Sequence, residues 1–355
     1  MRWNCWRKIM KVALITDQHL DGRKGSLAFW NFFQRFYDEV FFPTLEKKGV
    51  THVIDLGDTF DNRKSMDFNT FHRVKTNYFD KLQGYKVHML LGNHCTYYKN
   101  TNRINSPELL LEQYSNINIY ASPKHLTLGS KKFLMLPWIN TENRDEVLKL
   151  LETSDADICC GHLELNGFEV TPGMIMDHGM DHKLFHRFHR VWSGHFHHRS
   201  RKGNVQYLGN PYQMYWNDYK DTRGFHIYDT QSDKLEYIPN PFEIFEKITY
   251  DDSKEDYNKQ DVSCYKDKYI KIVVDEKRDY QMFETLVDRL YNVGVHDVKI
   301  VENLVGEDNK TDIDISAKDT LTLLNEYIDE VEMTVSKSDL KNLMRSLYIE
   351  SCNVV

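Results

Sequence analysis

The sequence has few cysteines and no long apolar run. Its six cysteines include no CxxC pair, and Cys159 and Cys160 are adjacent within an apolar segment, a setting typical of reduced, buried thiols. Neither a disulfide framework nor a structural zinc site is expected. No stretch approaches ~18 consecutive apolar residues, and the N-terminus lacks the apolar core of a secretory signal, so we expect no membrane segment and a cytoplasmic location.

Charge and histidine are unevenly distributed along the chain. Its 355 residues, 41% of them hydrophobic, are enough for one large domain and a smaller one. Residues 1–240 carry 31 Lys and Arg against 27 Asp and Glu, whereas residues 241–355 carry 15 against 26, and 15 of the 16 histidines precede residue 241. Metal and proton chemistry is therefore expected in residues 1–240, which we call the front part. Because the formal net charge is −7, any contact with DNA has to use a local basic patch.

Short apolar runs alternate with amphipathic stretches in the front part. The runs are bounded by Gly, Asp or Pro and have the composition of buried strands: 12–15, 53–54, 87–91, 133–136, 158–160 and 191–192. The stretches 27–48 and 67–83 have the apolar spacing of helices. This alternation predicts a layered α/β fold, in which ligands bind beyond the carboxyl ends of the strands.

The chain changes character after Pro239-Asn240-Pro241, where two prolines interrupt regular pairing and the histidines become rare. A strand at 269–274, a helix at 280–292 and a strand at 298–301 indicate a small α+β module. Two amphipathic helices follow a polar linker. The predicted divisions are a dispensable extension 1–9, a main domain 10–240, a module 241–305, a linker 306–318 and a helical segment 319–350.

Five motifs lie where apolar runs end: Asp17-Gln18-His19, Gly57-Asp58, Gly92-Asn93-His94, Gly161-His162 and Gly194-His195-Phe196-His197. Any one of them is weak evidence, but the ordered set indicates a site for two divalent cations. Asp58 is the candidate bridging ligand. Asp17, His19 and His197 would complete one set, and Asn93, His162 and His195 the other. Since no thiolate belongs to the set, Mn²⁺ is favoured over zinc of the structural type, with Mg²⁺ as an alternative.

With these motifs, residues 10–350 resemble the calcineurin-like metallophosphoesterases. The longer strings 57–64, 161–168 and 191–197 are similar to SbcD-type nuclease subunits of DNA double-strand-break repair complexes, including those of tailed phages. The resemblance implies an α/β fold, a four-layer β-sandwich flanked by helices, with a small α+β capping domain and a C-terminal helical pair. It also implies Mn²⁺-dependent 3′-5′ exonuclease and endonuclease activity in DNA repair, recombination or replication.

The resemblance further implies that His94 lies beside the scissile phosphate and assists the leaving 3′-oxygen while water attacks in line. Asp61, Arg63 and Cys95 would support the metal ligands through hydrogen bonds or contact the phosphate. Cys95 stands where the family usually has Asp, so we expect His94 to be poorly held, its pKa to be lowered and Cys95→Asp to raise the rate. The alternative is that another side chain supports His94. Two alternatives remain: a phosphomonoesterase or cyclic-nucleotide phosphodiesterase, and a weakly active metal-binding scaffold.

Loops after strand ends carry candidate contacts to the DNA backbone, for which a solvated face is the alternative: Arg23, Lys24, Lys64, Lys99, Arg103, Arg199, Arg201 and Lys202. By resemblance, 319–350 would bind an SbcC-type ATPase; packing of these helices on the 241–305 module is the alternative. A homodimer through 67–83 and 106–114 is also implied. If the chain is encoded by a phage, its location is the host cytoplasm.

Overall fold

The structure is a computed structural model that describes residues 10–171, residues 173–302 and several single positions between 328 and 344. The chain divides into two units, 1–302 and 303–355. The predicted extension 1–9 and linker 306–318 lie outside the described residues, as does most of the segment 319–350. In that segment the amide of Leu340 donates to the carbonyl of Ser336 over 3.0 Å, which is one helical turn. Within the described part of the chain, no helix has the length and apolar character needed to cross a membrane.

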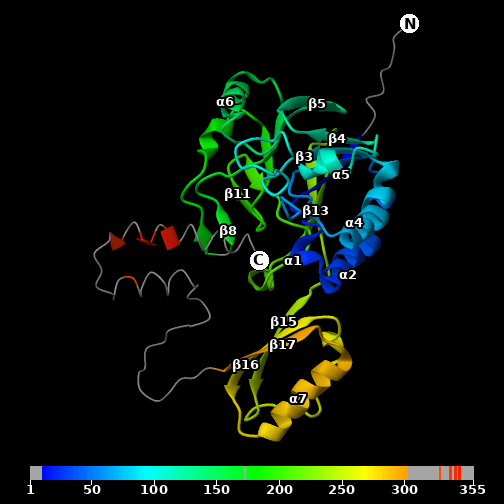
Figure 1. Ribbon diagram of the computed structural model, residues 1–355, viewed down its shortest axis with the longest axis vertical. Coiled ribbons are helices and arrows are strands. Elements are labelled where there is room, and N and C mark those ends of the chain that lie inside the picture. Colours follow the sequence, from blue (N-terminus) through cyan, green and yellow to red (C-terminus); the bar gives the residue numbers. More distant parts are fainter. Residues whose placement is uncertain are drawn as a thin grey trace. The chain divides into compact units, whose positions relative to one another are not determined.

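Two six-stranded sheets form the main body (Figure 1). The first has the order β14-β13-β1-β2-β3-β4, with bounds Lys234–Pro239, Gly224–Asp229, Lys11–Ile15, His52–Asp55, Lys86–Leu90 and Ile117–Tyr120. The second has the order β11-β12-β10-β7-β6-β5, with bounds Ser200–Lys202, Val205–Tyr207, Arg190–Gly194, Ile158–His162, Lys131–Leu136 and Lys124–Leu128. Strands β1 to β4 are parallel to one another, and so are β6, β7 and β10. All six predicted apolar runs form strands, with ends displaced by a few residues at most.

Alternate residues of the central strands enter different hydrophobic cores. Val12 and Leu14 of β1 lie in a cluster with Phe133 and Trp192 of the second sheet, so this core fills the space between the sheets. Ala13, in contrast, packs in the cluster beneath the helices that cover the outer face of the first sheet. Strands buried on both faces need a continuous apolar run, which is why the sequence pattern marks them clearly.

Helices cover the outer faces of both sheets. Over the first sheet lie α2, η1, α3, α4, η2 and η3, with bounds Leu27–Phe36, Tyr37–Phe41, Phe42–Lys48, Phe68–Val74, Lys75–Phe79 and Asp80–Gly84. Over the second lies α6 (Arg144–Thr153), whose Val147 and Leu151 pack against Leu134 and Cys159. The result is four layers, helix, sheet, sheet and helix, and it confirms the predicted α/β sandwich.

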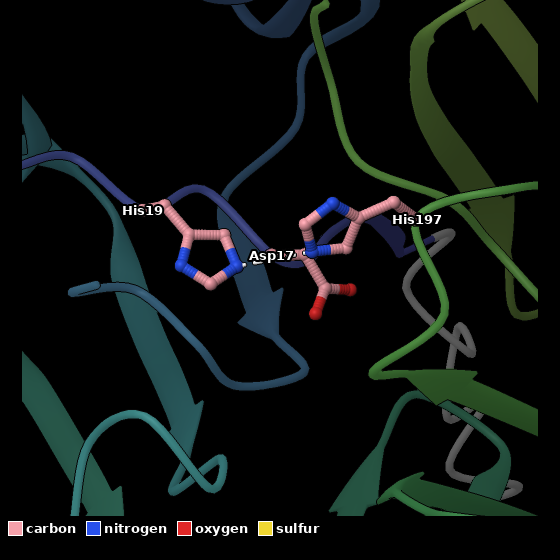
Figure 2. A group of neighbouring side chains, drawn as sticks. All are labelled: Asp17, His19 and His197. Carbon is pink, nitrogen blue, oxygen red and sulfur yellow. Dashed lines mark hydrogen bonds between the residues drawn. The ribbon is translucent and has the colours of Figure 1, made fainter. Parts of the chain in front are cut away.

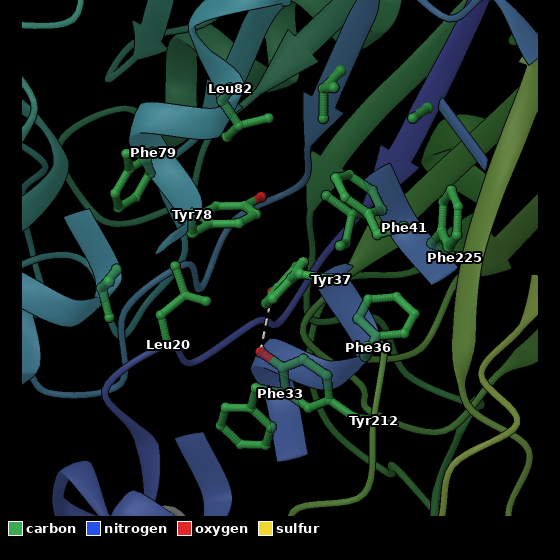
Figure 3. Packing of buried hydrophobic residues seen from close by; sticks show 14 of the residues in the cluster. Leu20, Phe33, Phe36, Tyr37, Phe41, Tyr78, Phe79, Leu82, Tyr212 and Phe225 are labelled. Atoms are coloured by element: carbon green, nitrogen blue, oxygen red, sulfur yellow. Dashed lines mark hydrogen bonds between the residues drawn. The ribbon is translucent and has the colours of Figure 1, made fainter. Parts of the chain in front are cut away.

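An aromatic cluster joins the first helical layer to the loop that follows β1 (Figure 3). The rings of Phe33 and Tyr212 stack with centroids 3.8 Å apart, and the hydroxyls of Tyr37 and Tyr212 are 3.2 Å apart. Tyr37 donates from its hydroxyl to Oε1 of Gln18 over 2.7 Å. Because Gln18 is the middle residue of the first motif, the packing of this layer positions that motif.

A smaller sheet follows the main body in the chain. Its parallel strands have the order β15-β16-β17, with bounds Phe245–Asp251, Tyr269–Glu276 and Asp297–Glu302, and α7 (Tyr280–Val293) lies along it (Figure 1). Phe283, Leu286 and Leu290 of α7 pack on Ile270 and Ile272. The elements predicted at 269–274, 280–292 and 298–301 are therefore present. The proposed division at residue 241 stays a prediction.

The remaining elements are short: α1 (Gly22–Gly25), α5 (Ser106–Leu110), β8 (Glu169–Thr171), β9 (Met174–Ile175), η4 (His182–Phe185), η5 (Trp216–Asp218) and η6 (Ser263–Tyr265).

Candidate metal centre

The five motifs all lie at the carboxyl ends of central strands. The loops after β1, β2 and β3 belong to the first sheet, and the end of β7 and the loop after β10 belong to the second. The strand ends of the two sheets meet, because the amide of His195 donates to both oxygens of the Asp17 carboxylate over 3.0 Å and 3.1 Å.

Backbone strain marks the same place. Asp17, His19, Asp58 and His195 have positive φ angles of 51°, 42°, 50° and 89°. Side chains other than glycine rarely adopt this region, which costs about 1–3 kcal/mol for each residue and is typical of functional sites. The surrounding structure therefore imposes these conformations on four of the predicted ligands.

The first predicted ligand set comes together as one group. Ligand atoms of Asp17, His19 and His197 all lie within 4.8 Å of one another, and Nε2 of His19 is 3.1 Å from Nε2 of His197. Figure 2 shows the two imidazoles with one ring nitrogen of each pointing toward the other, beside the Asp17 carboxylate. Burial, together with the charges of His19 and Arg223, holds the pKa of His197 well below its usual range. A neutral imidazole is the form that binds a metal.

The second predicted set also comes together. Ligand atoms of Asp58, His162 and His195 lie within 4.8 Å of one another. The amide oxygen of Asn93 is 3.0 Å from Nε2 of His162 and 3.0 Å from Nδ1 of His195. A carboxylate, an amide oxygen and two imidazoles thus converge on one small volume.

Asp58 belongs to the second group, and histidines of both groups act on its charge. It is 2% exposed and lies 3.2 Å from Nε2 of His162. Burial raises the pKa of this carboxyl, but the charges of His162, His94 and His19 outweigh burial and hold the pKa well below its usual range. Since these partners include a member of each group, a charged Asp58 fits the bridging position that the sequence predicted for it.

Two glycines make this approach possible. A Cβ on Gly92 would lie 2.1 Å from Oδ1 of Asp58, and a Cβ on Gly57 would lie 2.6 Å from Nδ1 of His162. Gly57 also has a φ of 105°, which favours glycine. In these two motifs the glycine therefore leaves room for a ligand from another motif.

Asp61 supports two histidines. Its carboxylate lies 2.9 Å from Nδ1 of His19, and its backbone carbonyl lies 2.7 Å from Nδ1 of His94. Burial lowers the pKa of His19, but the hydrogen bond to Asp61 and the charges of Asp61, Asp58 and Asp17 outweigh it and raise the pKa to about 9. For His94 burial prevails and its pKa is lowered, although Asp58 and Asp61 oppose the shift.

This geometry gives His94 a partner other than residue 95, and the effect of Cys95 on the rate stays a prediction. The ring of His94 is held by Asp61, 33 positions earlier in the chain, and its amide donates to Oδ1 of Asp58 over 2.8 Å. The Cys95 side chain is fully buried, so it is not accessible for contact with a phosphate. Burial, with the charge of Asp58, raises the pKa of its thiol to about 12.

The donor chemistry of the two groups fits divalent cations. Carboxylate oxygens, one amide oxygen and imidazole nitrogens face one another in the described residues, and no cysteine belongs to either group. Such mixed oxygen and nitrogen sets suit Mn²⁺, Mg²⁺ or a catalytic zinc better than a structural zinc site.

Several neighbours of the site were not singled out from the sequence. The indole of Trp138 lies 5.2 Å from the ring of His195, and Oε2 of Glu164 lies 3.3 Å from Nε2 of the same histidine. Gln18 donates from Nε2 to Oδ2 of the buried Asp55 over 2.8 Å. A strand-end position was the available signal for Trp138, and membership of a motif was the signal for Gln18.

The predicted cationic residues lie on different parts of the surface. Arg23 and Lys24 lie in α1, Arg201 and Lys202 lie in edge strand β11, and Lys64 is exposed after β2. Arg103 forms an ion pair with Glu142, which offsets its charge. Arg63 is half-buried, and burial lowers its pKa although the charge of Asp58 opposes this shift.

Comparisons with known proteins agree with this geometry. The model of the calcineurin-like phosphoesterase family matches residues 10–199. The chain is 31% identical to exonuclease subunit 1 of Enterobacteria phage T4 over 315 residues, which are 86% of this chain and 89% of the phage protein.

Two solved structures show a weaker likeness. An archaeal phosphodiesterase is 12% identical, with a TM-score of 0.35, over 65% of this chain and 100% of its own. A dimetal phosphatase from Danio rerio is 13% identical, with a TM-score of 0.40, over 66% of this chain and 97% of its own. Because the family model covers more than half of the chain and the phage relative covers most of it, the chain belongs to the calcineurin-like phosphoesterases.

Proposed function

We propose that this protein is a metal-dependent nuclease subunit that hydrolyses phosphodiester bonds of DNA, as a 3′-5′ exonuclease and an endonuclease. The observation that carries the proposal is the pair of ligand groups around Asp58, with His94 beside them. The phage T4 relative is an exonuclease subunit, which supports a polynucleotide substrate and a partner protein.

In the proposed site, Asp17, His19 and His197 would hold one cation, and Asn93, His162 and His195 would hold the second. Asp58 would be shared, with Mn²⁺ as the preferred ion and Mg²⁺ as the alternative. When bound, the two cations would lower the pKa of water and neutralise charge that develops on the phosphate oxygens.

His94 supplies proton chemistry from the protein. The Asp61 carbonyl can only accept a hydrogen bond, so Nδ1 of His94 carries the hydrogen and Nε2 is left for the substrate. Burial lowers the pKa of His94 in the free protein. The negative charge of a bound phosphodiester raises that pKa, so His94 becomes a donor to the leaving 3′-oxygen. The products are a 3′-hydroxyl and a 5′-mononucleotide.

A cleavage assay tests this function against the other reactions of the family. Labelled duplex DNA, a cyclic nucleotide and a chromogenic phosphomonoester are compared with Mn²⁺ present and after chelation. We expect Mn²⁺-dependent cleavage of DNA, reduced at least about 100-fold in His94→Gln and Asp58→Asn. His186→Gln, at an exposed position, is the matched control. Cleavage of DNA that persists in Asp58→Asn, or hydrolysis of the monoester alone, contradicts the proposal.

The weakly active scaffold is not favoured as a second candidate. It requires a poorly held His94, and the bond from His94 to the Asp61 carbonyl favours the nuclease instead.

The proposed partner is an SbcC-type ATPase bound by residues 319–350, and the proposed location is the cytoplasm, that of the host if the chain is encoded by a phage. The name of the phage relative, a subunit, supports a partner. Truncation after residue 315 should abolish co-purification with the ATPase and leave Mn²⁺-dependent hydrolysis of a small phosphodiester intact. Retained co-purification would place the contact elsewhere.

We also propose a homodimer through 67–83 and 106–114. Phe68 at the start of α4 is 90% exposed, and Leu109 in α5 is 71% exposed. Large apolar side chains with this exposure are typical of surfaces that pack against a partner.

A further inference from the structure

One face of the three-stranded sheet β15-β16-β17 packs under α7, and the other is covered at one end, where Phe29 of α2 stacks on Tyr269 and Trp216 packs on Phe245. Ile248, Ile270 and Ile272 point to the face that packs under α7. Alternation then places Lys247, Lys271 and Lys299 on the opposite face. Lys247 and Lys299 are exposed, and Lys271 is half-buried.

These three lysines form a row across the sheet. Lys247 pairs in register with Lys271, and Lys271 pairs in register with Lys299. Neighbouring strands lie about 5 Å apart, so the row spans about 10 Å and sets like charges side by side, an arrangement that is destabilising. Burial and the charges of Lys299 and Lys247 accordingly lower the pKa of Lys271.

Acidic partners do not relieve this repulsion. In the part of the chain that the structure describes, none of the three lysines forms an ion pair, whereas Lys254, Lys259, Lys268 and Lys277 of the same region all do. Residues 241–355 carry 26 acidic side chains against 15 basic ones, so acidic partners are abundant. Among the described residues, the row is therefore an unneutralised cationic feature.

Half-buried aromatic side chains lie beside this row. Nζ of Lys271 lies 4.4 Å from the ring centroid of Trp216, and the preceding Tyr215 lies under the guanidinium of Arg23 at 5.4 Å. Arg23 follows the ligand His19 by four positions. Basic groups interleaved with aromatic rings are typical of surfaces that bind nucleic acid.

We infer that the row Lys247, Lys271 and Lys299 binds the phosphate backbone of DNA and holds the duplex outside the metal centre. The inference rests on the proposed nuclease function and adds a second contact surface to it. A polyanion with regularly spaced charges matches a rigid row of cations, and contacts of this kind position DNA without reading its sequence.

The test measures binding of a labelled duplex to the full chain by fluorescence anisotropy, in EDTA to prevent cleavage, at several salt concentrations. The test variant is K247Q/K271Q/K299Q. The matched control K254Q/K259Q/K266Q removes the same charge from exposed positions outside the row. K247R/K271R/K299R keeps the charge. Hydrolysis of a small chromogenic phosphodiester with Mn²⁺ reports on the metal centre separately.

We expect the glutamine variant of the row to bind DNA on the order of 10- to 100-fold more weakly, with a salt dependence that is shallower by about 2–3 in the log–log slope. The control and the arginine variant should bind like the wild type, and all should hydrolyse the small substrate equally. Unchanged affinity and slope in the row variant would overturn the inference and leave the nuclease function standing. A wild-type chain that does not bind DNA would overturn both.

Discussion

Replacing Asp61 with asparagine tests which group holds the histidines beside the metal centre. The change removes a charge while keeping the size of the side chain and the backbone carbonyl. In the structure the Asp61 carboxylate lies 2.9 Å from Nδ1 of His19 and 3.7 Å from Nδ1 of His94. We expect weaker metal binding and slower hydrolysis in Asp61→Asn, because His19 loses the carboxylate that orients its ring.

The size of the effect follows from that contact. A hydrogen bond to a charged group contributes about 1.5–3 kcal/mol, and tenfold in affinity corresponds to about 1.4 kcal/mol. The expected loss in Mn²⁺ affinity is therefore about 10- to 100-fold, the range found when the partner of a histidine ligand is removed.

The measurement is a Mn²⁺ titration by calorimetry, paired with hydrolysis of a small phosphodiester across the same metal concentrations. Asp67→Asn is a matched control, since Asp67 is exposed and caps α4, where asparagine serves equally well. The control should keep the wild-type affinity and rate.

Substitutions at Cys95 complete the test. We expect Cys95→Ala to retain the rate, because the thiol is buried and His94 is bonded to Asp61. For the same reason Cys95→Asp, which from the sequence was expected to raise the rate, should not raise it. Wild-type Mn²⁺ affinity in Asp61→Asn, or a loss in Cys95→Ala as large as in Asp61→Asn, would refute this reasoning.

Three further changes probe other parts of the protein. Gly92→Ala should destabilise the fold by about 1–3 kcal/mol in urea denaturation and abolish metal binding, because its Cβ would overlap Asp58. Gly84→Ala should have neither effect, because its Cβ would meet nothing within 4 Å. Asp233→Asn should lower the free energy of unfolding by about 1–2 kcal/mol at pH 7. Burial raises the pKa of Asp233, but its bonds to Arg190 and Tyr228 outweigh burial and lower it, so its stabilisation is present above the ordinary pKa and is lost as the pH falls. The two proteins should thus converge in stability towards acid, and a constant difference would contradict this. Phe68→Ser with Leu109→Ser should convert a dimer to a monomer in analytical ultracentrifugation, and an unchanged mass would place the interface elsewhere.

The central strands were predictable and the edge strands were not. β1, β2, β3 and β7 are buried on both faces and leave continuous apolar runs. β5 and β14 are largely exposed or half-buried, so polar and apolar residues mix in them and no run stands out. Glu164 and Trp138 were not predicted, because many residues follow a strand and only the tertiary structure brings these two to His195.

The sequence by itself determined the family, the fold class and the order of the ligand motifs. Strand ends and glycine turns are local features, so the sequence alone shows which ligand type follows each strand. It could not identify the support of His94, because Asp61 lies 33 positions away while Cys95 lies next to it.

Tertiary structure decided which distant side chains meet. The contact between His19 and His197 spans 178 positions, and the lysine row depends on the register of three strands. Register and long-range contact arise from the packing of whole elements, and no short pattern in the chain encodes them.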